Sequence, residues 1–279
     1  MRLLSLVFFF LVLFSWPNSA QSQERPPERV ISLGPVTTEE IYLLSSQDKL
    51  VADTIYCVRP PEAKLKEKIG SIEDFNLEKI VSLKPDLVLA TELTNPQAVA
   101  KLRSLGVRVE NIPNARNFGD ICRTFLTLGR LLGKEKQAQA IIAKVQAQVE
   151  VLKAVVVHAP KVSVIVQVGS NPLVVVGRNT FPDDFIQSAG GTNAVKAQGY
   201  LQYSMEKVLG DNPEVMIISS MGFDGEQEKA NWEKFSILSP VIHHKIFIID
   251  QYLLCSPTPV SFVGTLKIMI HDLHPEIRS

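Results

Sequence analysis

The chain has 279 residues, of which 46% are hydrophobic and 21% are charged, a composition typical of a folded globular protein and not of a disordered one. Its 29 basic residues balance its 29 acidic residues, so the net charge is zero. Because no strong positive field exists to attract a phosphate backbone, we do not expect nucleic acid as a partner. A chain of this length can bury one or two substantial cores.

The first twenty residues are typical of a secretory signal. One cation precedes an apolar run over residues 3–14, and a polar stretch ends at Ala20. Such a run is too short to span a bilayer comfortably and suits the core of a signal peptide. We expect export, with cleavage near Ala20 and a proline-rich tether over residues 21–28. The alternative is an uncleaved anchor, because Asn18 is not the small residue usually found two positions before the cut.

Strands and helices are predicted to alternate through the first half of the chain. Short apolar runs bounded by turn residues indicate buried strands, and apolar positions at helical spacing indicate amphipathic helices. This alternation is typical of an α/β fold with right-handed crossovers. The predicted strands cover residues 30–33, 50–53, 87–90 and 107–109, and the predicted helices cover residues 37–44, 95–105 and 118–132.

A long amphipathic run begins at Lys134 and continues to residue 155. About twenty helical residues at 1.5 Å each reach roughly 30 Å, the width of a small lobe. We therefore expect a stiff helix that bridges two lobes. The alternative is a crossover helix within one sheet, although such helices are usually shorter.

The strand and helix pattern restarts after Pro160. Two apolar runs close together in sequence predict a hairpin, and the paired glycines at 190–191 mark a helix end. The predicted strands here cover residues 161–168, 173–176 and 245–250. One predicted helix begins at Thr180 or Asp183 and ends at the paired glycines. The last predicted helix covers about residues 260–273.

One fifteen-residue pattern occurs twice, as LEKIVSLKPDLVLAT at 77–91 and as MEKVLGDNPEVMIIS at 205–219. In each copy a proline follows the glutamate by seven residues, and an apolar run comes after it. Proline ends a helix and biases the preceding residue toward extended geometry. Each copy therefore predicts a short helix, a tight turn and a strand buried on both faces. The spacing of about 130 residues exceeds solenoid periods, which favours two similar lobes.

Loop residues from both lobes are predicted to surround one cleft. Parallel α/β sheets bind ligands in the crevice beyond the carboxyl ends of their strands. The loops at those ends carry mixed polar and apolar groups without a nucleophile paired to a base, which indicates binding. The expected lining comprises Thr37, Thr38, Tyr56, Cys57, Arg59, Thr91, Glu92, Asn95, Ser170, Asn171, Met221, Phe223, Tyr252, Leu254 and Cys255.

Motifs of the common enzyme classes are absent from the sequence, which lacks GxSxG, HExxH, P-loop and GxGxxG patterns. Its five histidines fall in the second half, and its three cysteines match no zinc spacing. We therefore expect no catalytic residues, no metal ligand set and no cofactor. Two alternatives stay open: an enzyme or chelatase that uses Cys57, Tyr56 or Glu92 in the same cleft, and a module that binds a partner without a small ligand.

Glu78 and Glu206 occupy the same position in the two copies of the repeated pattern. A helix that precedes a strand runs opposite to it, so the helix start lies at the strand's carboxyl end. Both glutamates are therefore expected on the face that bears the cleft, one on each lobe. The ordinary interpretation is a first-turn acid that offsets the helix dipole. Their match across the lobes favours a docking contact at two points.

Six motifs resemble those of the periplasmic substrate-binding proteins of ABC importers for vitamin B12, ferric siderophores and haem. The resemblance covers essentially the whole mature chain. It implies two similar three-layer α/β lobes joined by a long bridging helix, with the ligand cleft between the lobes. The motifs are RVISLGP (29–35), RPPEA (59–63), FNLEKIVSLKPDLVLA (75–90), LGRLLGKEKQA (128–138), AGGTNA (189–194) and YSMEKVLGDNPEVMIIS (203–219).

The resemblance also implies a role and a partner. Proteins of this kind are periplasmic, act as monomers and hand their ligand to a permease dimer in the inner membrane. Their glutamates at the positions of Glu78 and Glu206 pair with arginines of the permease. The expected organisation is a signal at 1–20, a tether at 21–28, an N-terminal lobe at 29–133, a bridging helix at 134–155 and a C-terminal lobe at 156–279.

The ligand implied first is a corrinoid such as vitamin B12. Around PPEA and NLEK the sequence is most similar to the vitamin-B12 binders, and Asp250 falls where one of their polar ligand contacts lies. Ile72 and Thr91, however, replace aromatic residues that those proteins place against the corrin, and Arg59 stands where a tyrosine is expected. The alternatives are an anionic iron chelate that faces Arg59, and haem whose iron is bound by Tyr56 or Tyr252.

Overall fold

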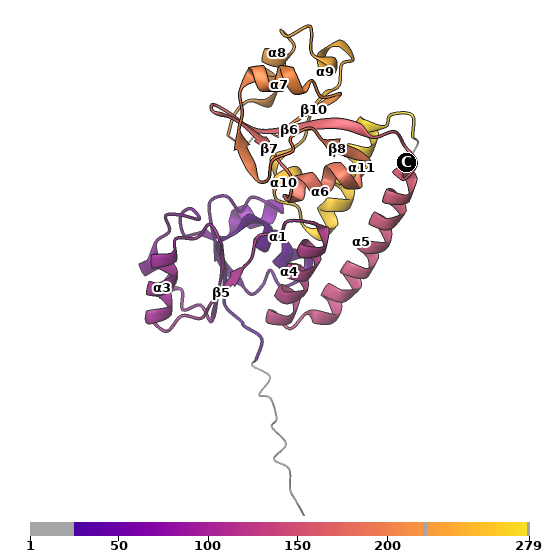
Figure 1. Cartoon of the computed structure of the whole chain (residues 1–279). Coiled ribbons are helices and arrows are strands. Elements are labelled where there is room, and N and C mark those ends of the chain that lie inside the picture. The colour runs from indigo at the N-terminus through magenta and orange to yellow at the C-terminus, as the bar shows by residue number, and fades with distance from the viewer. Residues whose placement is uncertain (1–24, 220–221, 278–279) are drawn as a thin grey trace, which may run out of the picture.

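The computed structural model describes residues 25–219 and 222–277. The predicted signal at 1–20 lies outside these residues. Two β-sheets form the centres of an N lobe and a C lobe, and helix α5 (Glu135–Val156) runs along one side of both (Figure 1). The predicted α/β fold with two lobes and a long helix between them is confirmed.

The N lobe has a five-stranded sheet in which all neighbouring strands are parallel, as predicted. The strands are β1 (Val30–Ser32), β2 (Leu50–Asp53), β3 (Glu67–Lys68), β4 (Leu87–Thr91) and β5 (Val109–Ile112), in the order β3-β2-β1-β4-β5. The helices are α1 (Pro35–Leu43), the 3-10 helix η1 (Pro61–Leu65), α2 (Leu77–Ser82), α3 (Pro96–Ser104) and α4 (Phe118–Leu131).

Alternate residues of β4 show that this sheet is the middle of three layers. Leu87 and Leu89 pack with residues of α1 and α4, whereas Val88 and Ala90 pack with residues of α2 and α3. A strand covered on both faces needs apolar side chains at every position. This requirement explains the unbroken apolar run in the sequence.

The C lobe has a six-stranded mixed sheet. Its strands are β6 (Val162–Ser170), β7 (Leu173–Val176), β8 (Gly191–Asn193), β9 (Tyr200–Gln202), β10 (Val215–Ile218) and β11 (Ile246–Ile248), in the order β11-β10-β6-β7-β9 with β8 paired to β6. The predicted hairpin of β6 and β7 is confirmed. The helices are α6 (Phe181–Ser188), α7 (Met205–Asp211), α8 (Gly225–Trp232), α9 (Ser239–Ile242), α10 (Gln251–Cys255) and α11 (Pro259–Leu273).

The repeated pattern forms the same local structure in both lobes. Asn76 caps α2 by accepting a hydrogen bond from Lys79 N at 2.8 Å, and Ser204 caps α7 by accepting one from Lys207 N at 3.3 Å. A side-chain oxygen at this position satisfies one of the free amides of a helix start. In each copy the helix leads into a strand whose apolar residues are buried.

An apolar core joins the two lobes at their base. Phe118, at the start of α4, lies 4.6 Å from Phe262 of α11 between ring centroids, and Phe262 stacks on Phe185 of α6 at 4.1 Å. The backbone amide of Phe118 also donates to Asp184 Oδ2 at 2.8 Å. Because close-packed interiors resist deformation, this core limits how far the lobes can move.

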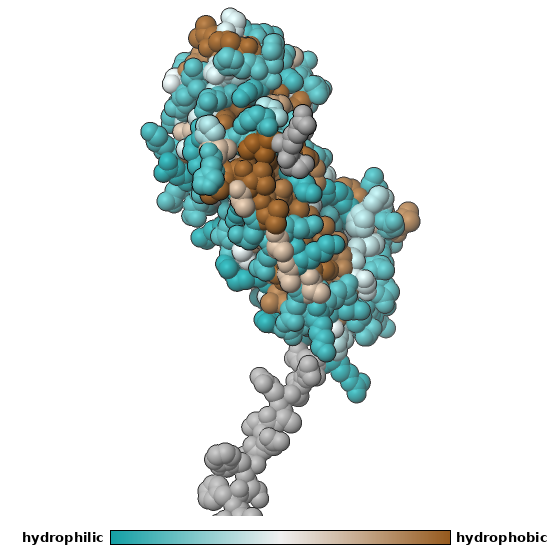
Figure 2. All heavy atoms as spheres, turned by 90° about the vertical axis from the view of Figure 1, so that its right-hand side faces the viewer, coloured by the Kyte–Doolittle hydropathy of each residue, from teal (hydrophilic) through white to brown (hydrophobic). Residues whose placement is uncertain are grey.

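The surface that bears α5 and α11 carries exposed apolar side chains. Figure 2 shows hydrophobic residues gathered on this side of the molecule, and the exposed ones on the two helices include Val151, Val155, Val260 and Ile268. Among the described residues, none of the helices has the length and apolar character needed to cross a bilayer.

Candidate functional site

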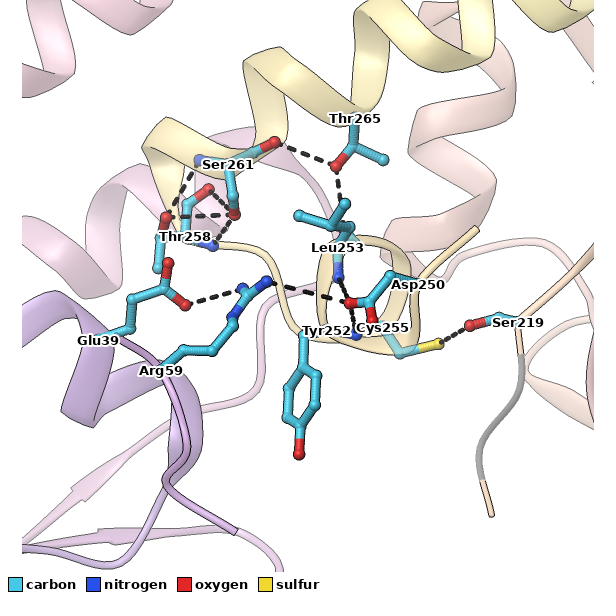
Figure 3. Close-up of polar contacts among 10 residues, drawn as sticks. All are labelled: Glu39, Arg59, Ser219, Asp250, Tyr252, Leu253, Cys255, Thr258, Ser261 and Thr265. Carbon is cyan, nitrogen blue, oxygen red and sulfur yellow. Dashed lines mark hydrogen bonds and ion pairs between the residues drawn. The ribbon is translucent and has the colours of Figure 1, made fainter. Parts of the chain in front are cut away.

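The two lobes meet where the loop after β2 faces the segment after β11. Both segments follow the carboxyl ends of parallel strands, the edge at which α/β sheets place their ligands. Arg59 comes from the loop of the N lobe, and Asp250 and Tyr252 come from the segment of the C lobe (Figure 3). The predicted cleft therefore has a contact between the lobes at this point.

Arg59 lies between two carboxylates. Its Nη2 donates to Glu39 Oε2 at 2.8 Å, and its Nη1 lies 4.0 Å from Asp250 Oδ1 (Figure 3). The guanidinium carbon also lies 5.2 Å from the ring centroid of Tyr252, within the range of a cation–π contact. Glu39 belongs to the N lobe, so Arg59 connects an acid of its own lobe to an acid of the other.

Lys68 holds the loop that carries Arg59 in place. Lys68 Nζ donates to the backbone oxygens of Cys57 at 3.1 Å and Ala63 at 2.9 Å, and to Asp53 Oδ1 at 2.5 Å. Asp53 is fully buried, and burial raises its pKa to about 6 against the opposing effect of Lys68. These bonds fix both ends of the segment that presents Arg59.

Cys57 and Thr38 anchor the same loop instead of facing the cleft. Both side chains are fully buried, and Thr38 Oγ1 donates to Cys57 Sγ at 3.1 Å. Thr37 is also buried in α1. Burial raises the pKa of the Cys57 thiol, which is the opposite of what an activated nucleophile needs. The structure thus corrects the expectation that these three residues line the cleft.

Helix α10 presents the acid and the aromatic ring of the C lobe. Asp250 caps this helix, since its Oδ1 accepts hydrogen bonds from Tyr252 N at 2.9 Å and Leu253 N at 3.2 Å. Thr265 Oγ1 of α11 donates to Leu253 O at 3.2 Å, and Cys255 Sγ lies 3.4 Å from Ser219 Oγ (Figure 3). The sequence predicts a loop for this segment, so the helix is a correction. Asp250 was the signal, because aspartate favours the N-cap position.

A partly buried polar network links β6 to α8 in the C lobe. Gln167, near the end of β6, donates to Glu228 Oε1 at 2.6 Å and accepts from Trp232 Nε1 at 2.7 Å. Ser170 Oγ donates to the other carboxylate oxygen of Glu228 at 2.8 Å. These bonds tie the end of β6 to α8. Sequence reasoning selects Ser170 alone from this network, because its other members gather only in three dimensions.

Leu254 is fully buried in the core of the C lobe, which corrects the expectation that it lines the cleft. The remaining described lining residues have partly or fully exposed side chains. Tyr56 and Glu92 are exposed in the N lobe, and Asn171 is exposed at the tip of the β6–β7 hairpin. Phe223 is half-buried against the core of the C lobe. Met221 lies outside the described residues. The exposed positions are candidates for ligand contact.

Thr91 is half-buried at the end of β4, beside Gly34, which follows β1. A Cβ added at Gly34 would lie 2.7 Å from Thr91 Cγ2, so this glycine lets the two strand ends approach closely.

Helix α1 begins at Pro35 after this glycine, and Thr37 and Thr38 do not cap it. The helix start therefore lies slightly earlier than predicted.

Glu78 and Glu206 are exposed in the first turns of α2 and α7. Hydrogen bonds from its own backbone amide and from Ser204 lower the pKa of Glu206. An exposed carboxylate at a helix start is stabilised by the positive end of the helix dipole. The structure therefore offers one exposed acid at the matching position of each lobe.

The site has the chemistry of a binding cleft. Among residues 25–219 and 222–277, no group of three or more histidine, cysteine or acidic side chains is placed to hold a metal ion. Burial raises the pKa of the Cys255 thiol as well as that of Cys57. The arrangement offers charged groups, hydroxyls and aromatic rings that can contact a large ligand.

Known proteins resemble the chain over most of its length. A family model described as periplasmic binding protein matches residues 30–251. The vitamin B12-binding protein of Vibrio cholerae is 27% identical over 261 residues, with 92% of each chain covered. The uncharacterized ABC transporter substrate-binding lipoprotein YvrC of Bacillus subtilis is 28% identical over 270 residues, with 93% of this chain and 84% of the relative covered.

Solved structures show the same two-lobed fold. The periplasmic vitamin B12-binding protein BtuF of Vibrio cholerae matches with a TM-score of 0.79 and 26% identity, over 91% of this chain and 99% of that one. A periplasmic haem-binding protein of Pseudomonas aeruginosa matches with a TM-score of 0.80 and 24% identity, over 90% and 94% of the chains. At that identity the second likeness concerns the fold alone.

Proposed function

Because the chain belongs to the periplasmic binding protein family, we propose that it captures a corrinoid such as vitamin B12 and delivers it to an inner-membrane permease. The coarser assignment is that of a substrate-binding protein of an ABC transporter, of the class that serves vitamin B12, haem and siderophores. The corrinoid, the docking residues and the location of this chain in the periplasm are the parts that we propose.

The charge balance at the meeting point of the lobes is the main observation that supports a corrinoid as the ligand. Glu39 and Asp250 supply two carboxylates against the single guanidinium of Arg59. A corrin ring is fringed with amide groups, which donate hydrogen bonds to such carboxylates. The carboxylates of haem would instead add negative charge beside them. The full-length similarity to vitamin B12-binding relatives supports the same ligand.

Haem or a ferric siderophore is the alternative ligand, and one observation favours it. Tyr56 is 49% exposed on the loop after β2, where its phenol is free to approach a ligand. A phenolate is a known type of ligand for haem iron. Tyr252 is less available for this role, because its ring lies against Arg59.

Delivery is proposed to use Glu78 and Glu206 as a two-point contact with the permease dimer. Each glutamate is exposed at the start of the repeated helix in its lobe, so two arginines on a symmetric partner can reach them. We propose that the protein works as a periplasmic monomer. Its closed lobes favour the ligand, and docking favours a state that releases it.

Closure of the cleft is proposed to be small. The core around Phe118 and Phe262 runs between the lobes at their base, and α5 packs along it. Two lobes that share a close-packed core cannot rotate freely against each other. The ligand is therefore held by rearranged side chains and modest lobe movement.

The bound compound tests this proposal. Native mass spectrometry and a visible absorption scan of protein purified from its source are expected to show one corrinoid per chain, and titration with cyanocobalamin is expected to saturate at one equivalent. Haem bands, with haemin binding and no cyanocobalamin binding, would contradict the corrinoid assignment. The returned ligand is expected to be unchanged, whereas turnover of the bound compound would support an enzyme or chelatase in the same cleft.

A further inference from the structure

We propose that Glu39 and Asp250 are specificity-determining residues, which mask Arg59 and so exclude ligands that carry carboxylates. This inference rests on the proposed function, because it concerns the same cleft. An unpaired arginine in a binding cleft attracts anions, and Arg59 follows the end of β2 where ligands of this fold class bind.

One end of the Arg59 guanidinium is hydrogen-bonded to an acid, and the other end faces a second acid. Nη2 donates to Glu39 Oε2 at 2.8 Å, and Nη1 faces Asp250 Oδ1 at 4.0 Å. Arginine binds a carboxylate best through two parallel N–H groups, and this geometry needs two free nitrogens on one edge. Nε is buried and has no hydrogen-bond partner among the described residues, so a ligand cannot reach that edge without displacing its cover.

The face of the guanidinium is covered as well. The ring of Tyr252 lies 5.2 Å from the guanidinium carbon, and the side chain of Arg59 retains only 27% of its exposure. Supports on both sides hold this arrangement in place: Lys68 fixes the loop of Arg59, and Asp250 caps α10 while it faces the cation. The masking groups are therefore parts of the folded frame.

The cluster carries a negative charge of one, because two carboxylates surround one guanidinium. A ligand carboxylate placed here meets repulsion from Glu39 and Asp250 together with an occupied Arg59. The side chain of Asp250 is 55% exposed, so it remains open to hydrogen-bond donors such as amides. The same three residues thus disfavour carboxylate-bearing chelates and accept amide-bearing ones.

The test compares haemin, which carries two propionates, with cyanocobalamin, which is fringed with amides. The variant is Glu39→Gln with Asp250→Asn, which keeps both side-chain shapes, and asparagine still caps α10. It exposes the charge of Arg59, so haemin affinity is expected to rise about tenfold, the scale of one partly exposed charge interaction. Cyanocobalamin affinity is expected to fall about threefold to tenfold, because a neutral amide oxygen accepts a hydrogen bond more weakly than a carboxylate does.

Matched controls separate a local effect from a change in net charge. Glu150→Gln with Asp48→Asn removes two exposed acids outside the cluster and is expected to leave haemin affinity unchanged. Adding Arg59→Gln to the cleft variant is expected to cancel the gain. Asp250→Asn alone, the mildest change, is expected to give a smaller rise in haemin affinity.

Two results would overturn the masking role: a cleft variant that binds haemin no more tightly than the natural protein, or an equal gain in the control variant. Tight haemin binding by the natural protein that Arg59→Gln abolishes would also overturn it, because Arg59 would then be available to an anion. Failure of cyanocobalamin to bind any variant would reject the corrinoid assignment instead. The haemin comparison would still decide the masking role, so the two failures are distinguishable.

Discussion

The ring of Phe118 lies 4.6 Å from the ring of Phe262 between centroids, and this contact joins the first turn of α4 to the C-terminal helix α11. Phe262 is fully buried and also stacks on Phe185. We expect Phe262→Ala to lower the free energy of unfolding by about 3–5 kcal/mol, the usual cost of truncating a buried phenylalanine. Urea denaturation followed by fluorescence and by circular dichroism measures the change.

The shared core also predicts that the natural protein unfolds in one transition, with both probes coincident. Ile268→Ala on the same helix is the control, because Ile268 is exposed and its loss is expected to change stability little. Two separate transitions in the natural protein, or equal effects of the two variants, would contradict a core that spans the lobes.

Glu40 is predicted to make stability fall as the pH rises. It lies in α1 with 1% exposure, and no described residue donates a hydrogen bond to its Oε1. Burial, and secondarily the charge of Glu39, raises the pKa of Glu40 from 4.5 to about 8. A carboxyl whose pKa is higher in the folded protein binds its proton there more tightly, so it stabilises the fold fully at low pH. That contribution is lost as the pH rises from about 4.5 to about 8.

Glu40→Gln removes this titration and is expected to flatten the decline of unfolding free energy between pH 5 and pH 8. Between pH 5 and pH 8 the unfolding free energy of the natural protein should fall by on the order of 4 kcal/mol more than that of Glu40→Gln, since each pKa unit corresponds to about 1.4 kcal/mol. Denaturant midpoints at several pH values provide the measurement. Glu150→Gln, on the exposed face of α5, is the control, and a Glu40→Gln profile parallel to that of the natural protein would disprove the buried titration.

The hydrogen bond from Trp232 Nε1 to Gln167 Oε1, at 2.7 Å, is predicted to support the C-lobe wall of the cleft. Trp232→Phe keeps an aromatic ring but leaves a buried acceptor without its donor, which costs about 1–3 kcal/mol. Gln167→Met removes the acceptor, so the double variant is expected to cost less than the two single variants together. Thermal or urea denaturation of all four proteins completes the cycle, and strictly additive losses would show that the bond contributes nothing.

Much of the fold can be predicted from the sequence because the signals for its strands and helices are local. Strand β4 needs apolar residues on both faces, and its four buried positions stand out as an unbroken run. The glutamates, the prolines and the apolar runs of residues 77–91 and 205–219 repeat in the same order, which is enough to predict two similar lobes. Strands β8 and β9 were missed because each has only three residues and little apolar character.

The centre of the site does not follow in the same way. Glu39, Arg59 and Asp250 lie on three separate segments, and Asp250 reaches the other two only because the lobes pack at a particular angle. Periodicity carries no information on that angle. The neighbours Glu39 and Glu40 illustrate the difference, because one step along a helix turns the side chain by about 100 degrees and so places one acid at Arg59 and the other in the core.

Burial explains the errors at Cys57 and Thr38. Cys57 follows the carboxyl end of β2, as its position in the sequence predicts, and Thr38 of α1 lies beside it. It does not say which way either side chain points. The hydrogen bond between their side chains turns both inward, where they hold the loop of Arg59.

Charge reversal at the two matched glutamates tests the central claim most directly. In cells of the source whose natural copy is replaced, Glu78→Arg with Glu206→Arg is expected to abolish cyanocobalamin uptake, while the purified variant keeps its affinity for cyanocobalamin. Glu73→Arg with Glu150→Arg, two exposed acids outside the repeated positions, makes the same change in net charge and is expected to leave uptake intact. Normal uptake by the Glu78 and Glu206 variant, or loss of its ligand affinity, would contradict delivery through a two-lobed receptor that docks by these acids.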